Sequence, residues 1–138
     1  MKTILVEDNI AEARLTQFAY SAVAPTTELV HCNSGTSFFE TLEKTPPETI
    51  AYILLDLNMP AISGFDVLKM LAAHKEWSWL PTIVLTSSSN QKDILASYEL
   101  GANAYVTKPI LMDDLNKIIA HIHKFWGEEN RLPGYAGF

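Results

Sequence analysis

The sequence predicts an α/β fold with a doubly wound, five-stranded parallel sheet, and two observations support it. Short apolar runs rich in β-branched residues alternate with longer stretches whose apolar residues recur at helical spacing. The run at 50–55 is apolar at every position, as is typical of a strand covered on both faces of a parallel sheet. Strands that alternate with helices pair in parallel through right-handed crossovers, so we expect helices on both faces of the sheet.

Five short apolar runs mark the strands, and a turn or capping signal follows each of them. The expected strands are 3–6, 28–32, 50–55, 82–85 and 104–106. The three acidic or amide residues after the first strand can cap the helix that follows, and Asn90 can cap the fourth helix. Pro25, the pair Pro46-Pro47 and Gly101 end the first, second and fourth helices. The last helix carries an apolar stripe of Leu115, Ile118, Ile119, Ile122, Phe125 and Trp126.

Length and composition fit one globular domain. The chain has 138 residues, of which 48% are hydrophobic and 19% charged, and this composition argues against disorder. We expect a domain over 1–126 and a C-terminal tail over 127–138. Leu132, Tyr135 and Phe138 of this tail are expected to be exposed and are candidates for docking to a partner.

Charge and cysteine content exclude several classes of function. The net charge is −6 and the pI is about 5.1, and no basic run is present, so nucleic-acid binding is not expected. Cys32 is the single cysteine, and no signal-peptide pattern is seen, which together predict a reducing, cytoplasmic setting. No apolar run approaches the roughly 18–20 residues that cross a bilayer, so no membrane association is expected.

Charged and hydroxyl side chains follow the predicted strands at their carboxyl ends, where sites form in open α/β sheets. Glu7 and Asp8 follow the first strand and Asp56 follows the third. The fourth strand ends at Thr86, and the fifth ends next to Lys108. We therefore expect three carboxylates, one hydroxyl and one ammonium at the same edge of the sheet.

This set of side chains favours phosphoryl chemistry beside a hard cation. Two carboxylates about 5 Å apart repel by about 3 kcal/mol at an effective dielectric of 20, so a cluster of three calls for a cation. Oxygen ligands that leave room for water and a phosphoryl group suit Mg²⁺. A carboxylate in that position can attack phosphorus to form an acyl phosphate. Lys108 and Thr86 are then placed to bind the phosphoryl oxygens.

Four segments in this order resemble the receiver domain of two-component response regulators. They are Glu7-Asp8, the stretch 56–64 (DLNMPAISG), the run 84–87 (VLTS) and the stretch 105–109 (YVTKP). The resemblance covers residues 1–126 and implies a flavodoxin-like (βα)5 fold with strand order 2-1-3-4-5. It also implies that Asp56 accepts a phosphoryl group from a sensor histidine kinase or a histidine phosphotransfer protein.

The same resemblance implies a Mg²⁺ ligand set. Asp8 resembles the direct carboxylate ligand and Glu7 an acidic residue that acts through water, although the family usually has Asp at one or both positions. Asp56 resembles the phosphoacceptor and a further ligand, and the backbone carbonyl of Asn58 resembles the next one.

The resemblance also implies a switch. Thr86 resembles the switch hydroxyl and Tyr105 the switch aromatic, and Lys108 resembles the lysine that binds the phosphoryl group. The Lys108–Pro109 peptide bond is often cis in this family. By hypothesis, Thr86 moves toward the phosphoryl group and Tyr105 turns inward, which reshapes the face made by the helix at 90–100, the strand at 104–106 and the last helix.

The implied function is that of a signalling protein and not of an enzyme, apart from self-catalysed phosphotransfer and autodephosphorylation. The chain looks similar to single-domain bacterial regulators that serve phytochrome-type and other hybrid kinases. We expect the signal to pass to a downstream protein target through direct contact, or the phosphoryl group to be passed on in a phosphorelay. Some regulators of this kind pair as dimers through the face just described, so a second copy of the chain is one partner that the resemblance allows.

Three alternatives compete with this interpretation. A Mg²⁺-dependent phosphatase with an aspartyl-phosphate intermediate would carry Asp-x-Asp near the first strand and a cap segment, neither of which is seen. A flavin binder would need a Gly/Ser/Thr-rich phosphate cradle where Glu7 and Asp8 stand. A receiver-shaped scaffold that is never phosphorylated would not need the full set of site residues. Each residue alone has an ordinary explanation as a cap, turn, strand or surface residue, but their joint placement favours a site.

Overall fold

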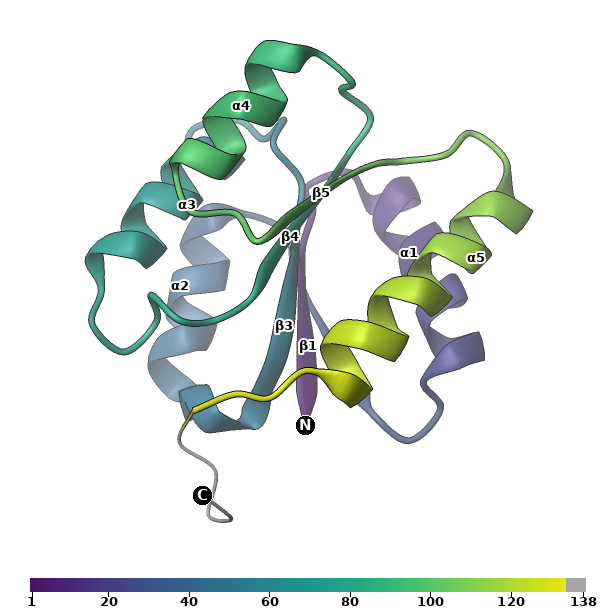
Figure 1. Ribbon diagram of the computed structural model, residues 1–138, viewed down its shortest axis with the longest axis horizontal. Helices are drawn as coiled ribbons and strands as arrows, with labels where there is room; N and C mark the ends of the chain where they lie inside the picture. Colours follow the sequence, from purple (N-terminus) through teal and green to yellow (C-terminus); the bar gives the residue numbers. More distant parts are fainter. Residues whose placement is uncertain (134–138) are drawn as a thin grey trace.

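The computed structural model describes residues 1–133 and confirms the predicted parallel sheet, with strand order β2-β1-β3-β4-β5 (Figure 1). The strands are β1 (Lys2–Val6), β2 (Glu28–Cys32), β3 (Ile50–Leu55), β4 (Thr82–Thr86) and β5 (Ala104–Thr107). The helices are α1 (Ile10–Val23), α2 (Gly35–Lys44), α3 (Gly64–Ala73), α4 (Gln91–Glu99) and α5 (Met112–Ile122), with the short helices η1 (Pro47–Thr49) and η2 (His123–Glu129).

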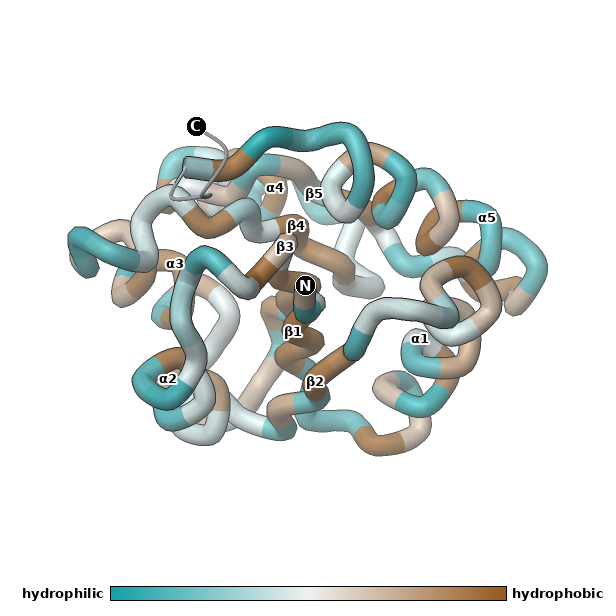
Figure 2. Tube along the Cα trace, turned by 90° about the horizontal axis from the view of Figure 1, so that it is seen from below, coloured by the Kyte–Doolittle hydropathy of each residue, from teal (hydrophilic) through white to brown (hydrophobic). Residues whose placement is uncertain are grey.

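The helices cover both faces of the sheet, as predicted. Helices α1 and α5 lie on one face, and α2, α3 and α4 lie on the other (Figure 1). Apolar stretches of the chain gather along the strands in the middle of the molecule, while the helices turn polar stretches outward (Figure 2). Each crossover begins at the carboxyl end of a strand, so the loops that follow the strands gather at this edge of the sheet.

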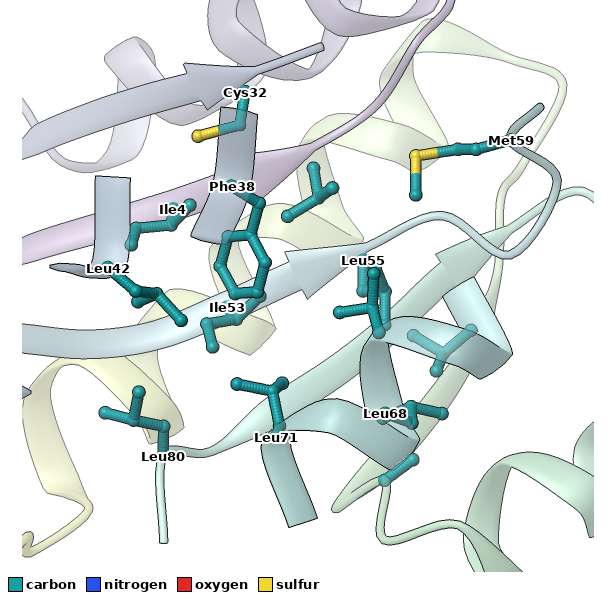
Figure 3. Packing of buried hydrophobic residues seen from close by; sticks show 14 of the residues in the cluster. Ile4, Cys32, Phe38, Leu42, Ile53, Leu55, Met59, Leu68, Leu71 and Leu80 are labelled. Atoms are coloured by element: carbon teal, nitrogen blue, oxygen red, sulfur yellow. The ribbon is translucent and has the colours of Figure 1, made fainter. Parts of the chain in front are cut away.

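β3 shows why its sequence has no alternation. All six of its residues are buried, because helices cover the strand on both sides. Ile53 and Leu55 point into the core beneath α2 and α3 (Figure 3), while Tyr52 and Leu54 point into the core beneath α1 and α5. Burial of each such aliphatic side chain is worth about 1.5–3 kcal/mol, so this strand anchors both cores and the residue that follows it.

Side-chain caps fix the helix starts that face the polar edge. Of the three residues expected to cap the first helix, Asn9 is the N-cap, and its Oδ1 accepts the Glu12 backbone N–H at 3.0 Å. Ser63 caps α3 in a reciprocal capping box with Asp66. Asn90 caps α4, as predicted. The loops around the edge therefore end in rigid helix starts, which limits the movement of the side chains they carry.

The C-terminal segment differs from the expected exposed tail. Helical structure continues to Glu129 as a π-helix, and residues 130–133 pass in front of β1 and β3 near their amino ends in the view of Figure 1. Leu132 is 6% exposed, so the prediction that its side chain is exposed is wrong: the returning chain buries this apolar residue. Tyr135 and Phe138 lie outside the described residues. The domain boundary at residue 126 stays a prediction.

His123 ties this C-terminal helix to the core. Its ring is 6% exposed, its Nδ1 lies 3.0 Å from the Tyr52 hydroxyl, and the Tyr20 ring meets it edge-on at a centroid distance of 5.3 Å. A Cβ on Gly127 would lie 2.5 Å from the imidazole, so glycine is required where the π-helix passes over the ring. The histidine at position 121, two residues earlier, is exposed, as expected for residues on different sides of a helix.

We predict that His123 makes stability depend on pH. Burial lowers the pKa of His123 below its ordinary value of 6.5, an effect that the charge of Glu128 partly offsets. The folded protein therefore keeps the ring neutral, while the unfolded chain takes up a proton below about pH 6.5, so stability is lost as the pH falls through this range. Denaturant unfolding at about pH 7 and pH 5.5 should show a larger loss for wild type than for His123→Gln. His121→Gln is the matched control, and an equal loss in wild type and His123→Gln would contradict the prediction.

Candidate functional site

Three carboxylates meet where β1 and β3 end. Glu7 and Asp8 follow β1, Asp56 follows β3, and one oxygen of each lies within 4.8 Å of the others. Glu7 is 2% exposed and Asp56 is 6% exposed, while Asp8 is half-buried. The strand ends thus bring together acidic residues that lie 48 positions apart, from Asp8 to Asp56.

This cluster has the chemistry of a site for a hard divalent cation. It offers only oxygen ligands, and mutual repulsion of about 3 kcal/mol per pair opposes it unless a positive charge is present. Both the donor type and the partial access at Asp8 fit an ion that keeps several water ligands. Asn58, two residues beyond Asp56, has an exposed side chain, and its backbone carbonyl stays a predicted ligand.

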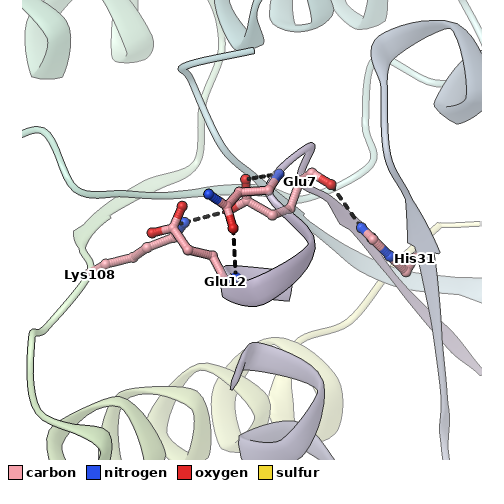
Figure 4. Close-up of polar contacts among 5 residues, drawn as sticks. Glu7, Glu12, His31 and Lys108 are labelled. Atoms are coloured by element: carbon pink, nitrogen blue, oxygen red, sulfur yellow. Dashed lines mark hydrogen bonds and ion pairs between the residues drawn. The ribbon is translucent and has the colours of Figure 1, made fainter. Parts of the chain in front are cut away.

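Lys108 places a positive charge beside the carboxylate cluster. Its Nζ donates to Glu7 Oε1 in a buried ion pair and lies 3.5 Å from Glu12 Oε1 (Figure 4). Its backbone N–H donates to the Thr86 carbonyl at 2.7 Å, which fixes the chain just after β5. The sequence placed Lys108 at this edge, but Glu12 was not identified as its partner. The position of Glu12 in the first turn of α1 could have indicated that it lies near the site.

Burial shifts the proton equilibria of this pair. Loss of hydration raises the pKa of Glu7 to about 7, although the hydrogen bond and charge of Lys108 pull the other way. Burial also disfavours the charged form of Lys108, but the hydrogen bond and charge of Glu7 outweigh it, and the pKa of Lys108 is raised. The Lys108 ammonium is therefore charged at neutral pH. The Glu7 carboxyl group is only partly ionised at the same pH.

We predict that cation affinity rises with pH through the range where Glu7 titrates. Because the pKa of Glu7 is about 7, the carboxylate is mostly protonated at pH 6 and mostly charged at pH 8. A cation must displace that proton, so the apparent Mg²⁺ affinity should increase about tenfold between these two values. Calorimetric titration with MgCl₂ measures this change. Glu7→Gln should flatten the dependence, and an affinity of the wild type that is constant with pH would contradict the prediction.

Neighbouring elements hold Glu7 in place. Its backbone carbonyl accepts from His31 Nε2 at 2.7 Å, so that ring nitrogen carries a proton (Figure 4). Its second carboxylate oxygen accepts the Asn9 backbone N–H at 3.2 Å. The edge strand β2 and the start of α1 thereby fix the orientation of Glu7 from both sides.

Gly64 allows the start of α3 to approach Asp56 closely. A Cβ at this position would lie 2.5 Å from the Asp56 carbonyl oxygen and 2.7 Å from the Leu57 Cα, both backbone atoms that cannot turn aside. The Gly64 N–H donates to the Leu57 carbonyl at 3.0 Å. The glycine is thus needed for contact with the segment that carries Asp56.

The two predicted switch residues differ in their surroundings. Thr86 is fully buried, and within residues 1–133 its hydroxyl oxygen has no hydrogen-bond partner. The Tyr105 hydroxyl donates to the Ser88 carbonyl at 2.8 Å, which ties β5 to the loop before α4. The Lys108–Pro109 peptide bond is trans, whereas the family resemblance implied that it is often cis. A buried hydroxyl without a hydrogen-bond partner costs about 1–3 kcal/mol, and the switch role of Thr86 stays a prediction.

A (βα)5 sheet with an acidic cluster, a paired lysine and an unpartnered threonine at its carboxyl edge defines a phosphoacceptor domain of the two-component class. The family model described as the response regulator receiver domain matches residues 4–120. The chain therefore belongs to the response regulator receiver domain family, which confirms the resemblance found in the sequence.

Relatives match over nearly the full chain. Response regulator Rcp1 of Synechocystis sp. is 36% identical over 136 residues, which cover 94% of this chain and 91% of that protein. The crystal structure of Mn²⁺-bound Rcp1 matches with a TM-score of 0.83 and 35% identity, covering 96% of this chain and 99% of that one. The phosphorylated cyanobacterial phytochrome response regulator RcpA matches with a TM-score of 0.86 and 34% identity, covering 96% and 98%.

Among the helices within residues 1–133, none is both long and apolar enough to span a membrane.

Proposed function

We propose that this receiver domain accepts a phosphoryl group onto Asp56 from the phosphohistidine of a sensor histidine kinase or of a histidine phosphotransfer protein. The observation that carries the proposal is the clustering of Asp56 with Glu7 and Asp8 within 4.8 Å, with the Lys108 ammonium bonded to Glu7. Such an arrangement offers a nucleophilic carboxylate, a cation site and a positive charge for the phosphoryl oxygens in one place.

In the proposed reaction, an Asp56 carboxylate oxygen attacks the phosphorus of the donor. A P–O bond forms to Asp56 while the P–N bond to the donor imidazole breaks, and the imidazole leaves with the bonding electron pair. Asp8, Asp56 and the Asn58 carbonyl would hold Mg²⁺, with Glu7 acting through water, and the ion would supply Lewis-acid stabilisation of the phosphoryl charge. Lys108 donates hydrogen bonds to a phosphoryl oxygen, and Thr86 donates its unpaired hydroxyl to another.

We infer that the acyl phosphate then acts on the face made by α4, β5 and α5. Thr86 is drawn to the phosphoryl group, and Tyr105, now tied to Ser88, changes its orientation on β5. Leu95 and Tyr98 of α4 are 61% and 49% exposed, which makes this face suitable for a downstream protein or for a second copy of the chain.

Two of the relatives support the proposal. One is the Mn²⁺-bound form of Rcp1 and the other is phosphorylated RcpA, at 35% and 34% identity to this chain. Because RcpA is a phytochrome response regulator, we infer a phytochrome-type kinase as the donor for this chain. We place the protein in the cytoplasm and assign it no turnover beyond self-catalysed phosphotransfer and autodephosphorylation.

Incubation with acetyl phosphate, with and without MgCl₂, followed by intact-mass measurement, tests the proposal. We expect a gain of one phosphoryl group that requires Mg²⁺ and decays as the acyl phosphate hydrolyses. No mass gain, or a gain without Mg²⁺, would contradict it. Multiple turnovers of phosphomonoesters would instead indicate a phosphatase.

A further inference from the structure

Glu12 stands at the mouth of the site and belongs neither to the carboxylate cluster nor to the proposed phosphoryl contacts. Its Oε1 lies 3.5 Å from Lys108 Nζ, and its side chain is 42% exposed, against 2% for Glu7. In the described part of the chain, the cluster able to hold a cation comprises Glu7, Asp8 and Asp56. Glu12 thus meets Lys108 from the solvent side, opposite the buried carboxylate (Figure 4).

The Glu7 carboxylate can bind either the Lys108 ammonium or a cation, and these two interactions compete. One of its oxygens accepts from Lys108 and the other from the Asn9 N–H, yet the same carboxylate is one of the three that offer an oxygen to a cation. A carboxylate that shares its charge with a divalent ion attracts a neighbouring ammonium less strongly. Glu12 lies outside the cluster, so its carboxylate does not have to serve as a cation ligand as well as a partner of Lys108.

We propose that Glu12 is a positioning residue that holds the Lys108 ammonium at the mouth of the site while Glu7 is engaged with a cation. Lys108 is then in place to meet the incoming phosphoryl group. This inference rests on the proposed function, in which Lys108 binds a phosphoryl oxygen.

Hydrogen bonds hold the backbones of Glu12 and Lys108 in place, so the fold keeps these two side chains within reach of each other. The Glu12 N–H donates to Asn9 Oδ1 at 3.0 Å in the first turn of α1, and the Lys108 N–H donates to the Thr86 carbonyl at 2.7 Å after β5. An acidic side chain in a first turn also stabilises its helix through the helix dipole. The test must therefore separate an effect through Lys108 from an effect on α1.

The first measurement follows the Lys108 ammonium directly by ¹H–¹⁵N NMR with saturating MgCl₂ and no phosphoryl donor. An ammonium held in an ion pair exchanges its protons more slowly with water, and its signal is preserved. We expect the Lys108 signal to be visible in wild type and Glu12→Asp, and to be lost or shifted in Glu12→Gln. Identical spectra for wild type and Glu12→Gln would overturn the inference.

The second measurement is the maximal rate of phosphorylation by acetyl phosphate at saturating MgCl₂. Glu12→Gln should lower this rate about two- to fivefold, the size expected for a partly exposed ion pair, and Glu12→Asp should restore part of it. The Mg²⁺ dissociation constant should change by less than about twofold. Asp113→Asn is the control, because it removes an equivalent charge from the first turn of α5.

A double variant shows whether Glu12 acts through Lys108. In a Lys108→Gln background, Glu12→Gln should have no further effect on the rate. The same loss in both backgrounds, an equal loss in Asp113→Asn, or an increased rate in Glu12→Gln would overturn the inference. If wild type itself gained no phosphoryl group, the proposed function would fail first, and that result is distinct from a normally phosphorylated Glu12→Gln.

Discussion

Replacing Asp56 by Asn should abolish phosphoryl incorporation and, in cation-free buffer, make the folded protein more stable. Asn keeps the shape of the side chain but cannot form an acyl phosphate. It also removes one of three carboxylates within 4.8 Å, two of which are almost fully buried. The relief of repulsion exceeds the lost attraction to Lys108, so we expect the free energy of unfolding to rise by about 1–2 kcal/mol.

Intact-mass measurement and denaturant unfolding, each with and without MgCl₂, check both parts of this prediction. Addition of Mg²⁺ should stabilise wild type more than Asp56→Asn, because the variant offers one ligand fewer. Asp113→Asn, an exposed change of the same charge, should be phosphorylated normally and show no such gain in stability. A phosphorylated Asp56→Asn protein would show that another residue is the acceptor.

Replacing Lys108 by Gln should produce the second large effect, on stability and on rate together. Lys108 is 11% exposed and Glu7 is 2% exposed, so loss of the ammonium leaves a buried carboxylate without its partner. We expect a loss of about 2–4 kcal/mol in the free energy of unfolding at pH 8. The loss should be smaller at pH 6, because the pKa of Glu7 is already about 7 and rises further without the lysine, so the buried group takes up a proton.

The phosphorylation rate of Lys108→Gln should fall about a hundredfold, as expected when one donor to a developing charge is removed. Mg²⁺ should restore much of the lost stability, since a cation neutralises the same cluster. Lys69→Gln, on the exposed side of α3, is the matched control. A variant as stable as wild type at pH 8 would mean that the Lys108–Glu7 pair contributes little to folding.

The fold was predictable where each residue type had one clear role. The six apolar positions at 50–55 predicted a strand buried on both faces, and all six are buried. Asn90 and Gly101 predicted the limits of α4 because a capping side chain and a positive φ of 106° are local requirements. The order of the strands came from the family resemblance, since alternation alone does not determine which parallel strands are neighbours.

The convergence of the three carboxylates was predictable from the strand ends, whereas the ion pairs around them were not. Strand ends bring Glu7, Asp8 and Asp56 together in any fold of this topology. The position of Glu12 in the first turn of α1 marks it as a residue near the edge, but its pairing and that of Glu7 with Lys108 depend on side-chain reach across the edge of the sheet. The roles assigned to these residues stay predictions until they are tested.

The C-terminal segment was misjudged for a related reason. Residues 127–138 were expected to form a tail with Leu132 exposed, but the side chain of Leu132 is buried. The contact between His123 and Tyr52, 71 positions apart, likewise depends on how α5 packs across β3. Long-range contacts of this kind appear only once the elements are placed together.

Localisation of the phosphoryl group tests the central claim most directly. After phosphorylation in the presence of Mg²⁺, borohydride reduces an aspartyl phosphate to homoserine, and peptide mass spectrometry locates the reduced residue. We predict homoserine at position 56 and at no other aspartate. Homoserine at another aspartate, or a phosphoryl group found on a serine, threonine or histidine with Asp56 unchanged, would contradict the account.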